Sequence, residues 1–323
     1  MFTQDKYFLT STYKHPYATK PYRKVPNLRH QFQMAFSKPQ NVQMVLDRGG
    51  AEGTPTLSTP AKYRIRLVSN AFHVSLEKSN KFWVSDGVER DFHPVPKNYL
   101  VQTNPEGDVL YKIQTSGGKG YHTVTDEENL IYADRVKKVI NIITKNNEPT
   151  EFIKTGDWEP LSIHSSRING DILVGMIREG EARVTRYNKT GRKKKDMPKY
   201  NNKMALYVHP HYITENINGD ICTSDIRKQA VVVVDEQGKY RFPYKGHERN
   251  FLPYGICTDT HGRILVCDYK EAVHRLDQDG NFLQYIFTRD DLVFPCSVCL
   301  DDKNNLYMGN AVTNIVTMYK YLQ

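Results

Sequence analysis

Asn218 to Asp225 reads NGDICTSD, and 43 residues later His261 to Asp268 reads HGRILVCD. Both segments place an apolar run between a turn and an aspartate. The pattern recurs four more times, as KFWVSD ending at Asp86, NLIYAD at Asp134, DILVGM at Met176 and NLYMGN at Asn310. Neighbouring copies are 42 to 49 residues apart. A period near 42 without helical periodicity is typical of a four-stranded propeller blade.

Each period has room for three more short strands around this motif. A strand such as 254–259 (YGICTD) precedes the motif, and one such as 230–235 (AVVVVD) follows it. A turn then leads into a last strand, and glycine supplies the positive φ that a tight hairpin needs. These turns are predicted at Gly107, Gly191, Gly238 and Gly280. Prolines stand at the start of the first strand in four periods, where no ladder hydrogen bond is lost: Pro160, Pro210, Pro253 and Pro295.

The six motifs predict an all-β fold, a six-bladed β-propeller over residues 62–323. The sixth blade has three strands after Pro295 and lacks a fourth. The segment 63–68 (YRIRLV) can supply it and close the ring, which removes the exposed edge of an open array. Residues 1–61 are rich in Lys, Pro, Gln, Thr and Tyr and show no steady alternation. They are predicted to form a basic, mostly irregular N-terminal arm.

Composition narrows the class of protein. The 323-residue chain is 39% hydrophobic and 25% charged, as in ordinary globular proteins. No apolar run approaches the roughly 18 residues of a membrane span, and the N-terminus has no apolar signal segment. We therefore expect a protein that is not inserted in a membrane. Five cysteines, an odd number, argue against a disulfide framework, so we expect a cytoplasmic location. The net charge of +9 is concentrated in residues 1–50 and 189–203, and such segments attract polyanions.

The segments DICTSD, AVVVVDEQGKYRFPYKGH, LPYGICTDTHGRILVCD and HRLDQDGNFLQYI closely resemble the NHL propellers of tripartite-motif proteins, especially those of invertebrate and molluscan type. The resemblance extends over residues 60–323 and is closest in blades four and five. It implies a module that holds structured RNA or a protein partner on one face. The RING finger of that family needs Cys and His ligands at set spacings, and the first cysteine here is Cys222. Ubiquitin-ligase chemistry is therefore not carried over to this chain, although the propeller could serve in such a system.

The antiparallel order of a blade predicts one face as the binding surface. The loop after the second strand and the loop into the next blade emerge on the same side, which we call the loop face. The hairpin turns emerge on the opposite side, the turn face, and carry Glu106, Asp235, Glu236 and Asp279. Cations and aromatic rings gather in the loops of the loop face, and this combination suits a phosphate backbone with unstacked bases. The candidate binding residues are Arg135, Lys137, Lys138, Arg178, His211, Arg227, Lys228, Lys245, Arg249, Tyr254, Lys270 and Arg289.

We therefore expect a monomeric, non-catalytic binding module for a protein partner or structured RNA, without cofactor or metal. The alternative is a propeller hydrolase or lyase with a metal in the central channel. His209 and His211 would be the candidate ligands for that metal. Tyr254 and Cys296 occupy the position of His211 in the next two blades and are poor partners for it.

Two further patterns have a structural explanation beside a functional one. An aspartate at the end of a strand suggests a metal ligand, but its carboxylate can also accept hydrogen bonds from the following turn. The run RKKK at 192–195 suggests a nucleic-acid patch. It also falls where the outer strand of blade three is expected, and a charged outer edge repels the addition of another strand.

Overall fold

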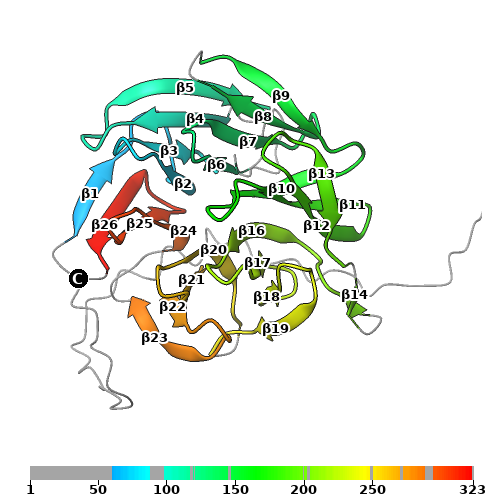
Figure 1. Cartoon of the computed structure of the whole chain (residues 1–323). Helices are drawn as coiled ribbons and strands as arrows, with labels where there is room; N and C mark the ends of the chain where they lie inside the picture. Colours follow the sequence, from blue (N-terminus) through cyan, green and yellow to red (C-terminus); the bar gives the residue numbers. More distant parts are fainter. Residues whose placement is uncertain are drawn as a thin grey trace, which may run out of the picture. The chain divides into compact units, whose positions relative to one another are not determined.

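The computed structural model describes residues 60–87, 98–116, 119, 121–144, 147–198, 200–201, 204–247, 250–269, 272–287 and 294–321. Six four-stranded antiparallel sheets surround one central axis, as Figure 1 shows. This confirms the predicted six-bladed, all-β propeller. The predicted arm lies outside the described residues except for its last two positions. The described part of the chain contains no helix with the length and hydropathy of a membrane span.

Within blades one to three, the strands follow chain order from the axis outward. Blade one contains β2 (His73–Leu76), β3 (Phe82–Ser85), β4 (Asn98–Thr103) and β5 (Val109–Thr115). Blade two contains β6 (His122–Val124), β7 (Leu130–Asp134), β8 (Val139–Ile143) and β9 (Pro149–Lys154). Blade three contains β10 (Glu159–Ser165), β11 (Ile172–Arg178), β12 (Glu181–Tyr187) and β13 (Lys193–Asp196). The predicted outer strand at RKKK is therefore present as β13.

Blades four and five repeat this order, and blade six modifies it. Blade four contains β16 (Pro210–Glu215), β17 (Ile221–Asp225), β18 (Ala230–Val234) and β19 (Tyr240–Tyr244). Blade five contains β20 (Pro253–Thr258), β21 (Ile264–Asp268), β22 (Ala272–Leu276) and β23 (Phe282–Phe287). Blade six contains β24 (Pro295–Leu300), β25 (Asn305–Asn310), β26 (Ile315–Lys320) and, as its outer strand, β1 (Ala61–Arg64). A small hairpin, β14 (Tyr200–Asn201) and β15 (Met204–Ala205), lies between β13 and β16 in the sequence.

Strand β1 closes the ring as predicted, but it is shorter than the predicted segment 63–68. It pairs antiparallel with β26, from Ala61 opposite Met318 to Arg64 opposite Ile315. Leu67 adopts a φ of 67°, a left-handed conformation that a continuing strand does not allow. The chain therefore leaves the sheet after Arg64 and turns toward the axis to begin β2.

Each repeat motif forms the second strand of its blade, and its neighbours explain its apolar character. Strands β7, β17 and β21 are buried along their whole length because other strands flank them and other blades cover both faces. The core consists of the layers between neighbouring blades. Leu173, Val184 and Val232, for example, pack together between blades three and four.

The predicted glycines and prolines occupy equivalent positions in several blades. Gly107, Gly191, Gly238 and Gly280 adopt φ values of 82°, 79°, 85° and 82° in the turns between third and fourth strands. At Gly280 a Cβ atom would also lie 2.3 Å from the Phe242 ring, so this turn has no room for a side chain. The predicted prolines stand at the start of the inner strands, and each coincides with a β-bulge in the pairing with the second strand: Pro160, Pro210, Pro253 and Pro295.

Candidate binding face and central channel

The loop face carries exposed cations on loops of blades two and four. Lys137 and Lys138 follow β7, Arg227 follows β17, and Lys245 follows β19, and all four are exposed. These positions agree with the antiparallel order of the blades, which places the loops after second and fourth strands on one side. The structure thus brings these four predicted residues to the surface of the same face.

Three other predicted cations on this face have nearby partners. Arg135 donates from Nε to Glu159 Oε1 at 2.5 Å. Arg178 lies over the Trp158 ring at 4.6 Å and pairs with Glu181 at 3.1 Å. Lys228 donates from Nζ to the Ala205 carbonyl at 2.6 Å. The positive charge of blades two and three is therefore partly neutralised by glutamates that the sequence pattern did not associate with these arginines.

His211 and Tyr254 lie in the interior, contrary to the expectation of rings displayed on the loop face. Their exposed fractions are 1% and 8%. The two rings contact each other with centroids 5.0 Å apart, and Tyr121 and Tyr212 pack edge to face at 5.1 Å. The inner strands begin where the blades converge on the axis, so aromatic residues there fill the centre of the ring. We call Phe72, Tyr121, His211, Tyr212 and Tyr254 the aromatic plug.

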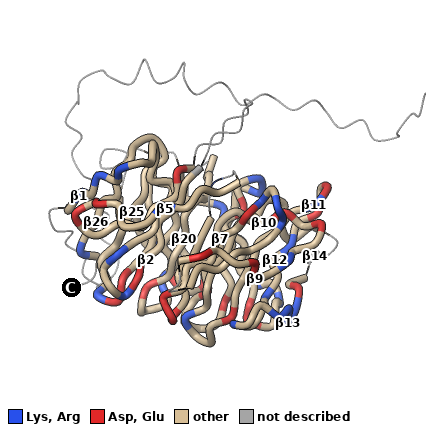
Figure 2. The backbone as a smooth tube through the Cα atoms, turned by 90° about the horizontal axis from the view of Figure 1, so that it is seen from above, with Lys and Arg blue, Asp and Glu red and all other residues tan. Residues whose placement is uncertain are grey.

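The remaining predicted residues of the face, Arg249, Lys270 and Arg289, lie outside the described residues. The distribution of charge within the described part is also less one-sided than expected. Figure 2 shows Lys and Arg on both sides of the disc. The turn face carries Lys78, Lys189, Arg192 and Lys303 besides its many acidic residues.

Exposed apolar side chains on the loop face were not anticipated from the sequence. Met204 is 73% exposed, Val136 68%, Leu67 58%, Val208 41% and Val312 37%. Each lies in a connection on the loop face or in the β14–β15 hairpin. The signal in the sequence is an apolar residue within a polar loop, as Val136 between Arg135 and Lys137, and the strand repeat carries no information about such loops.

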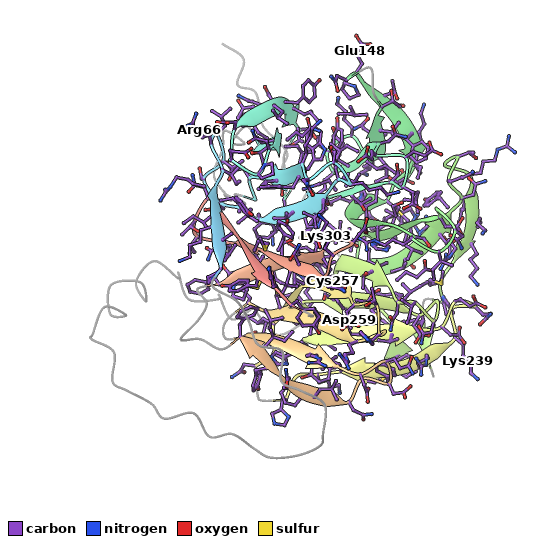
Figure 3. All side chains as sticks on the ribbon, turned by 60° about the vertical axis from the view of Figure 1, so that its left-hand side comes forward. Arg66, Glu148, Lys239, Cys257, Asp259 and Lys303 are labelled. Carbon is purple, nitrogen blue, oxygen red and sulfur yellow. The ribbon has the colours of Figure 1, made fainter. Side chains whose placement is uncertain are left out.

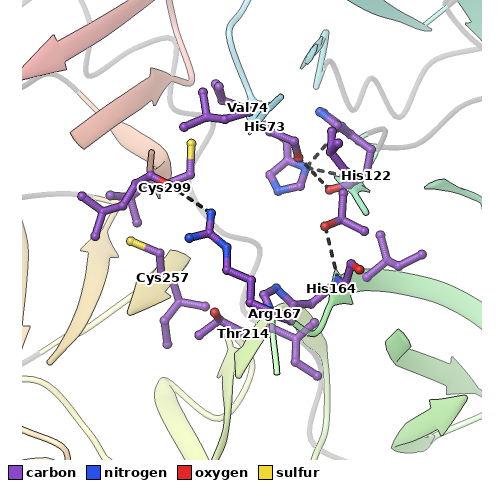
Figure 4. A pocket seen from close by; sticks show the side chains of 18 of the residues that line it. His73, Val74, His122, His164, Arg167, Thr214, Cys257 and Cys299 are labelled. Carbon is purple, nitrogen blue, oxygen red and sulfur yellow. Dashed lines mark hydrogen bonds between the residues drawn. The ribbon is translucent and has the colours of Figure 1, made fainter. Parts of the chain in front are cut away.

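A channel along the axis forms the pocket of Figure 4. Its volume is about 570 Å³, and it extends from Tyr121, His211 and Tyr212 of the aromatic plug to the turns at Glu77–Asn80 and Asp301–Lys303. The channel therefore opens toward the turn face. Figure 3 places Cys257 and Lys303 near the axis, whereas Arg66, Glu148 and Lys239 lie at the outer rim.

Six side chains at equivalent positions of the inner strands form a ring around this channel. Each is paired with the residue that occupies the third position of its blade's repeat motif, as Thr214 with Cys222 and Cys257 with Leu265. The ring consists of Ser75, Thr123, His164, Thr214, Cys257 and Cys299. All six line the pocket, and all six are polar or sulfur-containing although the strands around them are largely apolar.

Four histidines line the channel, and two of them, His73 and His122, form a pair. His73 and His122 approach with their Nδ1 atoms 3.3 Å apart, and His122 Nε2 lies 3.2 Å from the Trp83 carbonyl. Burial, together with the neighbouring His122, holds the pKa of His73 well below its ordinary value. Burial is also the main reason that the pKa of His164 falls to about 3, with Arg167 and Arg186 adding to the effect. His73 and His164 are therefore neutral at physiological pH.

The groups needed for the metal alternative do not come together in the described part of the chain. There, no group of three or more His, Cys, Asp or Glu side chains is placed to hold a metal ion. His209 and His211 have ring centroids 6.0 Å apart, and His211 Nδ1 lies 3.1 Å from the Ser224 carbonyl. The five cysteines are free thiols.

Comparisons with known proteins show the fold. No protein-family model matches the chain, and no curated protein matches its sequence. The structure is similar to virginiamycin B lyase from Staphylococcus aureus, with a TM-score of 0.57 and 13% identity over 82% of this chain and 99% of that one. It is similar to a gluconolactonase from Xanthomonas campestris, with a TM-score of 0.60 and 14% identity over 84% and 98%. It is also similar to the WD40 propeller domain of Doa1, with a TM-score of 0.53 and 14% identity over 76% and 77%.

At such identities these similarities show a propeller and do not assign a reaction or a ligand. The NHL and tripartite-motif resemblance therefore remains an expectation from the sequence motifs. What the comparisons add is that this six-bladed chain shares its architecture with distant propellers named as a lyase and a gluconolactonase.

Proposed function

We propose that this protein is a non-catalytic propeller that binds an acidic protein segment on its loop face. The observation that carries the proposal is a patch in which the exposed apolar side chains of Met204 and Val208 adjoin the exposed Arg227 and the half-buried Lys228. We call Met204, Val208, Arg227 and Lys228 the mixed patch. Such a surface is complementary to a segment that carries both carboxylates and apolar side chains.

Hydrogen bonds hold the mixed patch together across three segments of chain. Val208 donates its backbone N–H to Asp225 Oδ2 at 2.6 Å, and Lys228 donates its own to Asp225 Oδ1 at 3.0 Å. Lys228 Nζ reaches the Ala205 carbonyl, next to Met204. Asp225 and Lys228 thus fix the β14–β15 hairpin and the chain before β16 against the turn after β17.

A further cation, Lys245, adjoins the mixed patch. Val231 of β18 is paired with Tyr244 of β19, so Lys245 emerges beside the residues that precede β18. Lys245 and Arg227 are exposed. An acidic partner would therefore meet several cations around an apolar centre, an arrangement that favours fast association and a defined orientation.

A protein partner is favoured over RNA because the two aromatic residues predicted to bind on this face, His211 and Tyr254, are buried. Base stacking on aromatic side chains is a main source of affinity for unpaired nucleotides. His211 and Tyr254 are enclosed in the aromatic plug and offer no such platform. Exposed Met204 and Val208 suit apolar side chains of a protein better than a phosphate backbone.

The test compares two charge reversals of equal size. Arg227→Glu with Lys245→Glu changes the loop face, and Lys189→Glu with Lys239→Glu changes exposed lysines of the turn face. Partners are captured by cross-linking in nuclease-treated extract, and each candidate is then purified and titrated. We expect the loop-face variant to weaken a partner's binding at least about tenfold and the turn-face variant to change it little, since buried charge-assisted contacts contribute this much.

Met204→Asp provides a second arm, because it removes the apolar centre without touching a cation. Met204→Asp should lower the affinity of the protein for the same purified partner. The loss should be largest at low salt, where the new carboxylate repels an acidic segment most strongly. Equal losses in the loop-face and turn-face variants would contradict the proposal. Anisotropy titration of a structured RNA hairpin across a salt series forms the last arm. Tight, steeply salt-dependent binding lost in the loop-face variant would replace the protein partner with RNA.

A further inference from the structure

The open end of the central channel is spanned by an arginine. Arg167 lies in the turn after β10 of blade three and donates from a terminal nitrogen to the Leu300 carbonyl of blade six at 3.1 Å. In a ring of six blades the third and sixth stand opposite each other. Figure 4 shows the side chain of Arg167 crossing the opening between Thr214 and Cys299. The guanidinium thereby reaches across the channel opening to blade six.

This contact uses a small part of the hydrogen-bonding capacity of Arg167. A guanidinium has five N–H donors in a planar fork that matches two oxygens of a carboxylate or phosphate. The bond to Leu300 is the one that Arg167 makes within the described residues. Because Arg167 is exposed, its other donors are open to solvent or to a ligand at the mouth of the channel.

Beneath Arg167 lies a shell of neutral donors and acceptors. The ring of six includes the hydroxyls of Ser75, Thr123 and Thr214 and the imidazole of His164. His164 also lines the channel, and its Nε2 is covered by protein and has no hydrogen-bond partner among the described residues.

The positive charge of Arg167 reaches the same shell. It adds to burial in lowering the pKa of His164. Burial raises the pKa of the Cys299 thiol to about 12, and the Arg167 charge opposes that shift. Burial also raises the pKa of the Cys257 thiol well above its ordinary value, and the Arg167 charge opposes this shift too. The charge of Arg167 thus affects the pKa of three of the six channel side chains, His164, Cys257 and Cys299.

Carboxylates around the channel are engaged elsewhere or lie at its outer edge. Glu215 is paired with the buried Arg186 at 2.5 Å, and Glu77 accepts hydrogen bonds from Trp83 and Gln102. Asp301 accepts backbone N–H groups of its own turn, from Lys303 and Asn305. Asp126 and Asp302 are exposed at the rim, where Lys78 and Lys303 accompany them.

We propose that the channel binds a small polar organic anion, with its carboxylate or phosphate on Arg167 and its body against Thr214 and His164. The volume of about 570 Å³ suits a small molecule and excludes a macromolecule. The aromatic plug closes the far end, so the ligand enters and leaves at the turn face. This site is independent of the mixed patch on the opposite face.

The test titrates the whole chain by calorimetry with citrate, gluconate, glucose 6-phosphate and, as the uncharged probe, glucose, at constant ionic strength. We expect at least one anion to bind and glucose not to bind. Arg167→Gln should lower the affinity for that anion about tenfold or more, since it removes a charge-assisted hydrogen bond. Lys189→Gln is the matched control, because it removes one charge from the same face outside the channel.

Thr214→Val is a second variant that should leave the fold intact, because valine is nearly isosteric with threonine. It removes one hydroxyl from the channel. It should weaken the same anion several-fold while the melting temperature without ligand stays near that of the wild type. Preference for gluconate or citrate over glucose 6-phosphate identifies a carboxylate ligand, and the reverse identifies a phosphate ester. Absence of binding by all three anions, or equal losses in Arg167→Gln and Lys189→Gln, would overturn the proposal.

Discussion

At the scale of single residues, the aspartate that ends a second strand joins two loops. Asp225 accepts the backbone N–H groups of Val208 and His209 through Oδ2, at 2.6 and 2.9 Å, and that of Lys228 through Oδ1. In blade six Asn310 accepts the N–H groups of the residues two and three positions further along. The predicted hydrogen bonds from the following turn are present at Asp225, which is why a carboxylate is useful there without a metal.

Asp225→Ala should lower the free energy of unfolding by about 2 to 4 kcal/mol, because three backbone donors lose their acceptor in a buried site. Urea denaturation monitored by fluorescence measures the change. Asp225→Asn retains one side-chain oxygen, as Asn310 does naturally, and should lose clearly less. An alanine variant within about 0.5 kcal/mol of wild type would show that water replaces the carboxylate.

The sequence could identify these aspartates but not the direction of the aromatic rings. Tyr254 and His211 stand next to loops, and a residue at the start of an inner strand can face solvent or the axis. Alternation within one strand does not decide this, since the axis is formed by six strands from distant parts of the chain. Arg167 was likewise unpredictable, because its partner Leu300 is 133 positions away.

At the scale of elements, the segment that closes the ring is held by more than strand pairing. Ile65, just after β1, is fully buried in a cluster with Val74, Val84 and Val316 from blades one and six. Its backbone N–H donates to the Asn314 carbonyl at 2.8 Å. The repeat period predicted that a strand from this region closes blade six. It could not predict that the chain leaves the sheet at Arg64, because the apolar pattern of 63–68 continues unbroken.

Ile65→Ala should lower the free energy of unfolding by about 2 to 4 kcal/mol, since it leaves a cavity between the first and last blades. Leu67→Ala is the matched control, because Leu67 is two residues away and 58% exposed. The control should change stability by less than about 0.5 kcal/mol. Thermal and urea unfolding of both variants measure the difference, and equal effects would mean that Ile65 does not anchor the closure.

At the scale of the whole molecule, buried neutral histidines in several blades make stability depend on pH. Burial, with a contribution from His247, lowers the pKa of His274 to about 4. The pKa values of His73 and His211 are lowered well below the ordinary value, again mainly by burial. Between the lowered values and the ordinary value near 6.5, the unfolded chain binds protons that the folded chain does not. Stability is therefore greatest above pH 6.5 and falls as the pH decreases.

His274→Gln should make this acid-induced loss shallower. At pH 5 a histidine with such a shift destabilises the fold by about 2 kcal/mol relative to pH 7.5, and the glutamine variant lacks that contribution. Urea titrations at the two pH values give the difference for each protein. His261→Gln, in an exposed turn, is the control and should keep the wild-type slope. An unchanged slope in His274→Gln would mean that the imidazole reaches solvent before the fold opens.

The antiparallel pairing of β1 with β26 has a mechanical consequence. Ala61 lies opposite Met318, so the chain enters and leaves the domain at the same end of this pair. Tension applied through the flanking segments would load the inter-strand bonds one after another, from that end inward, instead of all at once. Separating β1 from β26 by such tension therefore needs less force than breaking the same bonds together, and blade six is the blade that opens first.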